Sequence, residues 1–200
     1  MPIGVPKVPC RLSEGSRSDW VDVYNLLSRE RVLFLIQSLD DKIVNQIVRL
    51  LLYLSCERGE VDISLYVNFS GGSGISGLFL VDTIQYIKVD VSTINVGLAT
   101  SIATFVIARG KRGKRFSLPY ARFMVHQSDE KSQGSATNIF SESKETIRLR
   151  RCISQLYVTF TEQLVSRIII DLDRGEFLNA RQACEYGIID LVSRNVAILL

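Results

Sequence analysis

The chain has 200 residues, of which 46% are hydrophobic and 22% charged, and its formal net charge is +3. This length fits one domain, which can bury about 70% of its unfolded surface and needs no disulfide or metal ion for stability. The composition excludes a disordered polyelectrolyte, and so small a positive charge does not favour nucleic-acid binding. The longest uncharged stretch, 91–108, contains several serines and threonines and is too polar for a lipid-facing span, so we expect a soluble protein without a membrane partner.

The cysteines and the single histidine argue against metal chemistry. Cys10, Cys56, Cys152 and Cys184 lie far apart and form no CxxC pair. A zinc site needs closely spaced Cys or His ligands, so the sequence predicts no metal site. We expect buried or incidental free thiols in a reducing compartment, and no cleaved targeting segment at the N-terminus.

The N-terminal segment is rich in proline. Three of the four prolines fall within the first nine residues and predict an extended arm that projects from the body. From Asp19, a predicted helix cap, apolar residues recur at helical spacing up to Val32.

Strand and helix patterns then alternate up to residue 127. We expect helices over 43–54 and 78–87 and from Ala99 onward. We expect strands over 32–36, 62–68, 91–96 and 121–127. This alternation predicts an α/β fold with parallel strands.

A long helical pattern runs from about Thr137 to Leu164. Such a helix measures about 40 Å, more than a domain of this size needs for its own core, which favours a subunit interface. The alternative is an ordinary surface helix with a solvated arginine face. A helix over 180–186 capped by Gly187 and a strand over 188–192 are expected to follow.

Ser101 stands where a strand gives way to a helix, among small residues such as Gly97 and Ala103. Small neighbours let a substrate backbone approach the hydroxyl group, and the amide of Ile102 could stabilise an oxyanion. This position favours a nucleophile. The other interpretation is a serine that caps the helix.

His126 is the only histidine and closes a predicted strand, where parallel α/β sheets place functional groups. Because serine is unreactive without a base, serine hydrolysis by imidazole catalysis in this chain must use His126. A hydrogen-bonded structural histidine is the alternative.

Two further segments suggest binding chemistry, one rich in glycine and the other rich in basic residues. The glycine loop 70–74 follows a strand but matches neither phosphate-loop pattern, and it can instead donate an amide beside a nucleophile. The basic run 109–115 resembles a nucleic-acid or anion patch. A solvated turn is the favoured alternative, because no aromatic platform accompanies the charges.

These segments occur in the order found in one family, and the chain resembles the proteolytic subunits of the Clp protease (ClpP). The resemblance extends from about Ser18 to Val192. The segments that carry it are NFSGG at 68–72, GLATS at 97–101, GKR at 113–115 with LP at 118–119, MVHQ at 124–127, QGSAT at 133–137, and FLNA at 177–180 through YGIID at 186–190.

The resemblance implies a ClpP/crotonase-like α/β fold with a protruding handle helix at about 137–164. It also implies an axial N-terminal arm over 1–17 and a single domain over 18–200. The first nine residues look like the version encoded in plastid genomes, which implies a location in the plastid stroma.

The implied activity is that of a serine endopeptidase without a cofactor. It cleaves unfolded polypeptides delivered by a Clp ATPase unfoldase, and it assembles with other Clp proteolytic subunits in a fourteen-subunit double ring. On the matching positions, Ser101 is the nucleophile, His126 is the general base, and the amides of Gly72 and Ile102 are the oxyanion donors.

The sequence departs from the family pattern at the acid of the triad, whose position falls on Gly175. Asp173 and Glu176 flank it, and Glu176, with the longer reach, is the predicted substitute acid. In the segment after the histidine, Ser128 replaces a proline, and Glu130 and Lys131 replace glycines of the substrate-pairing strand.

These departures favour a second hypothesis, a catalytically weakened structural subunit of a mixed Clp ring. A third, a crotonase-type acyl-CoA enzyme on the same fold, leaves the match at Ser101 and His126 unexplained.

Overall fold

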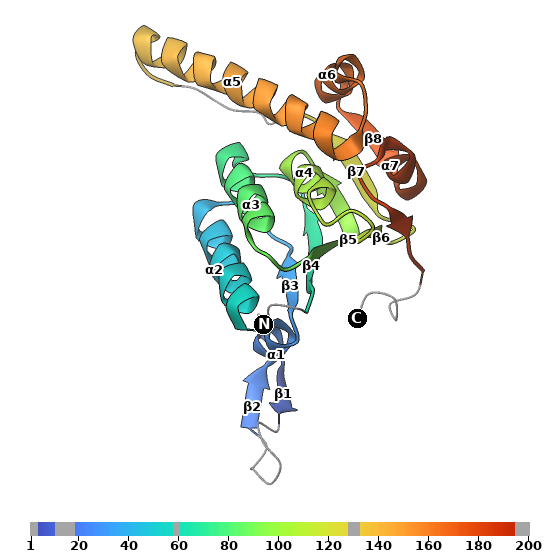
Figure 1. Ribbon diagram of the computed structural model, residues 1–200. Coiled ribbons are helices and arrows are strands. Elements are labelled where there is room, and N and C mark those ends of the chain that lie inside the picture. Colours follow the sequence, from blue (N-terminus) through green and yellow to red (C-terminus); the bar gives the residue numbers. More distant parts are fainter. Residues whose placement is uncertain (1–3, 11–18, 58–60, 128–132, 195–200) are drawn as a thin grey trace.

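The computed structural model describes residues 4–10, 19–57, 61–127 and 133–194 (Figure 1). The strands are β1 (Lys7–Cys10), β2 (Asp19–Asp22), β3 (Val32–Leu35), β4 (Ile63–Phe69), β5 (Val91–Thr100), β6 (Arg115–Ser117), β7 (Arg122–Val125), β8 (Glu176–Asn179) and β9 (Leu191–Val192). The helices are α1 (Val23–Arg29), α2 (Asp41–Glu57), α3 (Gly74–Tyr86), α4 (Ile102–Ala108), α5 (Ala136–Thr161), α6 (Val165–Arg174) and α7 (Ala180–Tyr186).

The predicted α/β fold with parallel strands is confirmed. Strands β3, β4, β5, β6 and β9 lie in this order and are parallel to one another. β7 runs parallel to the last residues of β5, and β8 pairs with it in the antiparallel direction. Every second side chain of β4 is buried, and α2 buries residues at helical spacing from Val44 to Leu54, so the apolar core forms between sheet and helices.

The N-terminal segment is extended and projects from the body of the molecule, as expected, and its strand β1 is paired (Figure 1). β1 pairs with β2, so that Lys7 lies opposite Asp22 and Cys10 lies opposite Asp19. The helix expected from Asp19 is therefore wrong for its first turn, because α1 begins only at Val23 and Trp20 of β2 is 68% exposed. The boundary expected between 17 and 18 lies outside the described residues.

Other predicted boundaries are wrong as well, since the helix expected over 78–87 begins at Gly74 and the strand expected over 91–96 continues to Thr100. The helix expected from Ala99 begins at Ile102, because Ala99 and Thr100 continue β5 and pair with β7. The strand expected over 188–192 is limited to β9. Three further elements, β6, α6 and β8, were not predicted from the sequence.

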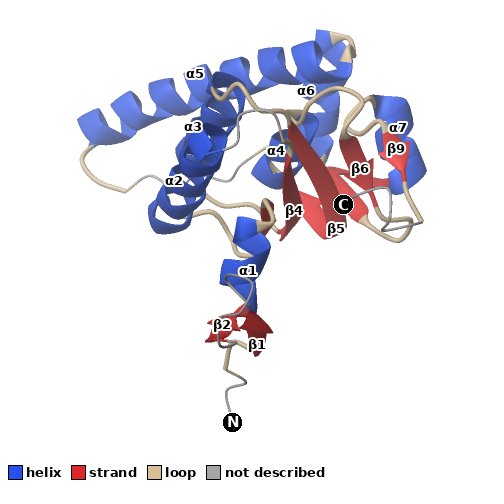
Figure 2. Cartoon of the chain, turned by 60° about the horizontal axis from the view of Figure 1, so that its bottom comes forward, coloured by secondary structure: helices blue, strands red, loops and turns tan. Residues whose placement is uncertain are grey.

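The expected long helix is present as α5, and its two ends differ in environment. Its buried residues, from Ser154 to Thr161, all lie in its C-terminal third. Ile139, Phe140 and Ile147 are exposed, and the N-terminal part of α5 extends beyond the sheet (Figures 1 and 2). Among the described helices, none is both long enough and apolar enough to cross a membrane.

The basic run 109–115 is neutralised by acidic neighbours. Four of its five basic side chains form ion pairs: Lys111 with Asp90, Arg112 with Glu162, Lys114 with Asp62 and Asp90, and Arg115 with Asp190. These ion pairs favour the charged-turn interpretation of the segment, which connects α4 to β6.

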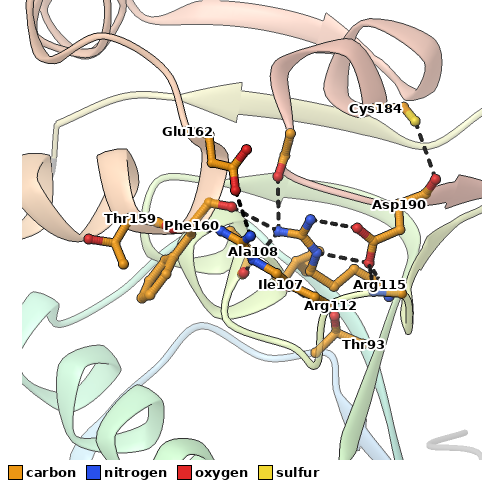
Figure 3. Close-up of polar contacts among 12 residues, drawn as sticks. Thr93, Ile107, Ala108, Arg112, Arg115, Thr159, Phe160, Glu162, Cys184 and Asp190 are labelled. Atoms are coloured by element: carbon orange, nitrogen blue, oxygen red, sulfur yellow. Dashed lines mark hydrogen bonds and ion pairs between the residues drawn. The ribbon is translucent and has the colours of Figure 1, made fainter.

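Arg115 is the buried member of this run and ties several segments together (Figure 3). Its Nη2 and Nε atoms donate to the Asp190 carboxylate at 2.6 and 3.0 Å. Its Nη1 atom donates to the carbonyl oxygens of Ala108, Phe160 and Gly187 at 3.3, 3.2 and 2.9 Å. These carbonyls lie at the C-terminal ends of α4, α5 and α7, so one guanidinium satisfies acceptors that each helix leaves unpaired.

The Asp190 carboxylate is held in its charged form. Burial alone would raise its pKa, but the hydrogen bonds and positive charge of Arg115, together with the Gly113 amide at 2.7 Å, lower the pKa below its usual range. The thiol of Cys184 donates to the Asp190 carbonyl at 3.4 Å, whereas Cys56 and Cys152 are exposed. Of the two alternatives for the thiols, Cys56 and Cys152 therefore fit incidental thiols rather than buried ones.

Candidate active site

Ser101 occupies a sharp turn between β5 and α4. Its φ of 53° and ψ of −119° are uncommon for a residue with a Cβ atom, and such strained residues concentrate at functional sites. Its amide donates to the Met124 carbonyl at 3.0 Å. The side chain makes no capping hydrogen bond to the described helix α4, so the helix-capping interpretation of Ser101 is wrong.

The glycine loop lies directly against this turn. A Cβ atom at Gly71 would lie 3.6 Å from the Cβ atom of Ser101. Gly72 has a φ of 150°, and a Cβ atom there would lie 2.4 Å from the Leu39 carbonyl oxygen, so this position accepts only glycine. The Leu39 amide donates to the Gly71 carbonyl, and the Ser73 amide donates to the Leu39 carbonyl. Neither of these hydrogen bonds uses the amide of Gly72.

His126 follows β7 and shares a small cavity with Ser101. The cavity is also lined by Ile102 and by residues of α4, α5 and α6. The chain after the histidine is fixed to α6, because the Gln127 amide donates to the Leu172 carbonyl at 3.2 Å. The fold thus brings together the two residues that sequence reasoning had selected from separate strands.

Tyr157 connects α5 to the serine turn, a contact that sequence reasoning missed. Its ring is 1% exposed and packs edge-on against Phe105 at 5.3 Å between centroids. Its hydroxyl donates to the Ser101 carbonyl at 3.4 Å, and burial raises the pKa of this phenol. The only sequence signal was a tyrosine at an apolar position of a helical pattern.

Gly175 lies beside the imidazole. It ends α6 with a φ of 70° and a ψ of 59°, and its amide donates to the Asp171 carbonyl at 3.1 Å. A Cβ atom at this position would lie 3.3 Å from Cδ2 of His126 and 3.0 Å from Cε of Met124. A side chain at residue 175 would therefore touch the histidine ring.

The two carboxylates that flank Gly175 contact other groups. Asp173 accepts from Nη2 of Arg150 at 2.6 Å, which ties α6 to α5. Glu176 lies opposite Val125 in the strand register and acts electrostatically on Tyr186, whose pKa it helps to raise. Among the residues that the structure describes, neither carboxylate forms a hydrogen bond or ion pair with His126.

The remaining positions that sequence reasoning singled out lie outside the described residues. These are Ser128, Glu130 and Lys131, which follow the histidine. The substrate-pairing strand therefore stays a prediction.

Comparison with known proteins gives a single family. The model of the family described as Clp protease matches residues 14–196. Similar proteins named "ATP-dependent Clp protease proteolytic subunit" occur in Oltmannsiellopsis viridis, at 50% identity over 96% of this chain and 99% of that protein, and in Chlorella vulgaris, at 49% over 96% of each. A protein of Gloeobacter violaceus named "ATP-dependent Clp protease proteolytic subunit 1" is 44% identical over 96% of this chain and 97% of its own length.

Proposed function

Because this chain belongs to the Clp protease family, we propose that it is a serine endopeptidase, the proteolytic subunit of an ATP-dependent Clp protease. The observation that carries this proposal is the placement of Ser101 and His126. They line one cavity, and the serine sits in a strained turn where its side chain does not cap the helix.

In the proposed mechanism the Ser101 hydroxyl attacks the carbonyl carbon of a peptide bond. His126 accepts the hydroxyl proton and then donates it to the leaving amine. The negative charge on the carbonyl oxygen is stabilised by the amides of Gly72 and Ile102. The position of the glycine loop against the Ser101 turn supports these two donors. The reaction needs no metal or cofactor.

The orientation of His126 is the weak part of this site. An acid at residue 175 would touch the imidazole, and glycine provides none. Loss of the triad acid lowers the rate by on the order of 10⁴ in the serine proteases. The role of Glu176 as substitute acid stays a prediction, and its place opposite Val125 does not favour it.

We place the chain in a fourteen-subunit double ring in the plastid stroma, together with other Clp proteolytic subunits and a Clp ATPase that delivers unfolded polypeptides. The exposed apolar residues on the projecting part of α5 support a packing role for this helix. Sizing by light scattering tests the assembly, and a well-behaved monomer of 22.5 kDa would contradict it.

The experiment that tests catalysis is labelling with a fluorophosphonate, which reacts with activated serines. We expect Ser101 to be labelled in the wild-type complex and labelling to vanish in Ser101→Ala. Ser143→Ala, which changes an exposed serine of α5, is the matched control and should label normally. Absence of labelling at Ser101 would favour the catalytically weakened subunit.

A further inference from the structure

Three arginines outside the cavity of Ser101 and His126 line an open cleft of about 870 Å³. Arg122 begins β7, Arg181 lies on α7, and Arg194 follows β9. All three side chains are exposed. Within the described part of the chain, no acidic side chain lines this cleft or pairs with these arginines.

This lack of partners distinguishes the cleft from the basic run 109–115. There, carboxylates of the same chain neutralise four of the five charges. The cleft instead keeps three positive charges available in one concave surface. An anionic group from another molecule would find its charge complement here.

Arg122, one of the residues that line the cleft, lies on the same face of β7 as Met124, and the chain continues from this strand to His126. Phe123 and Val125 of β7 are buried, whereas Arg122 is exposed and Met124 is half-buried. Since side chains of a strand alternate between its faces, Arg122 and Met124 lie along one face. This face points away from the core.

Neighbouring strands extend this face into an apolar strip between the cleft and the site. Phe177 of β8 lies opposite Met124 and is 60% exposed. Leu98 of β5 lies beside Arg122 and is 39% exposed. An extended peptide can therefore cross an apolar surface before it reaches the arginines.

The distance from Arg122 to His126 can be expressed as a number of residues of an extended substrate peptide. At about 3.3 Å per residue, the four steps from Arg122 to His126 correspond to about 13 Å. An extended peptide covers this distance with about four residues. A substrate side chain three or four residues from the cleaved bond would reach the cleft.

We propose that Arg122, Arg181 and Arg194 form a specificity subsite for an acidic side chain of the substrate, three or four residues from the bond that Ser101 cleaves. This inference rests on the proposed function, because it assumes that Ser101 cleaves a peptide. Carboxylates suit the site since guanidinium groups bind them through paired hydrogen bonds.

The test uses the assembled complex and peptides that carry Glu, Gln or Lys at each position up to five residues on either side of the cleaved bond. We expect the ratio of kcat/KM for the Glu peptide to that for the Gln peptide to be about 1.5-fold to fivefold at one position, the range of exposed charge pairs. Added salt should reduce this ratio.

Substitutions then assign the preference to the cleft. In the triple variant Arg122→Gln, Arg181→Gln, Arg194→Gln the ratio should fall towards one, and Arg181→Glu should shift the preference towards the Lys peptide. Arg49→Gln, which removes an exposed arginine of α2, is the matched control and should keep the wild-type ratio.

The outcomes separate this inference from the proposed function. If fluorophosphonate labels Ser101 and the Gln peptides are cleaved without any preference for Glu, the subsite is wrong and the peptidase stands. If the arginine variants change the size of the complex but not the preference, the cleft is a subunit contact and the subsite is again wrong. Failure to label Ser101 overturns both.

Discussion

The two halves of the candidate site differ in how completely they are built. The serine half is fixed by backbone hydrogen bonds, by the glycine loop and by Tyr157, and its turn is already strained. In the histidine half the ring lies beside Gly175, and within the described part of the chain neither Asp173 nor Glu176 forms a hydrogen bond or ion pair with it. Among the described residues, the surroundings of Ser101 are therefore more fully determined than those of His126, and the position of a nucleophile and the orientation of its base can vary separately.

The largest expected effect comes from restoring an acid beside His126. Gly175→Asp places a carboxylate against the imidazole, and aspartate tolerates a left-handed backbone better than most residues. Peptide cleavage should rise by up to about 10⁴, and by much less if a substitute acid already serves. Gly175→Asn is the matched control, because it has the same shape without the charge. Equal rates for the two variants would contradict the assignment of residue 175 as the acid position.

The next effect concerns the serine half. Gly72→Ala should lower peptide cleavage by about 10² to 10³, the cost of losing one oxyanion donor, because its Cβ atom cannot fit against Leu39 and the loop must move. Steady-state kinetics with a thermal unfolding curve measures it. Gly113→Ala is the control, because Gly113 also has a positive φ, of 84°, but a Cβ atom there would meet open space. A normal rate in Gly72→Ala would exclude the loop from catalysis.

The pH dependence of the free energy of unfolding tests the contact between Arg115 and Asp190, which holds the end of the helix that begins at the Ser101 turn. The folded pKa of Asp190 lies below its unfolded value, so its pairing with Arg115 stabilises the protein above about pH 4 and is lost as the pH falls through the folded pKa. Asp190→Asn should lower the free energy of unfolding at pH 7 by about 3 kcal/mol, since Arg115 remains buried without its partner.

Urea unfolding between pH 3 and pH 7 measures this difference. It should shrink at the acid end, where wild-type Asp190 becomes protonated as well. A difference that stays constant over the whole range would show that the carboxylate charge is not what matters.

The smallest effect is expected at Glu176. If this carboxylate orients His126 weakly, Glu176→Gln should lower kcat by less than about tenfold, because its strand position is opposite Val125. Glu185→Gln, an exposed acid on α7, is the control. A loss near 10⁴ in Glu176→Gln would instead identify Glu176 as a full triad acid.

Local patterns were sufficient for much of the fold. Strict alternation predicted β4, and α7 was predicted to its exact ends, where Asn179 and Gln182 form a capping box and Gly187 takes a left-handed conformation. α6 was missed because only Ile168 and Leu172 are buried in it, too short an apolar stripe to recognise. β2 was missed because its exposed Trp20 fits a helical spacing with Val23 and Leu26 of α1.

For the site, residue chemistry could select Ser101 and His126, since one is a serine at a strand end and the other is the only histidine. It could not predict their shared cavity or the contact between residue 175 and the imidazole. Both depend on α6 returning to β7 through the Gln127 and Leu172 hydrogen bond, a long-range contact without a local signal.

The contact between Arg115 and Asp190 also bears on the order of folding. The two residues are 75 positions apart, and the carbonyls of Phe160 and Gly187 join the same guanidinium. Until the ribosome has released residue 190, Arg115 has neither its carboxylate nor the end of α7, and burying it is unfavourable. The parallel sheet around β6 therefore closes only after residue 190 has left the ribosome, which makes the nascent chain dependent on protection until that point.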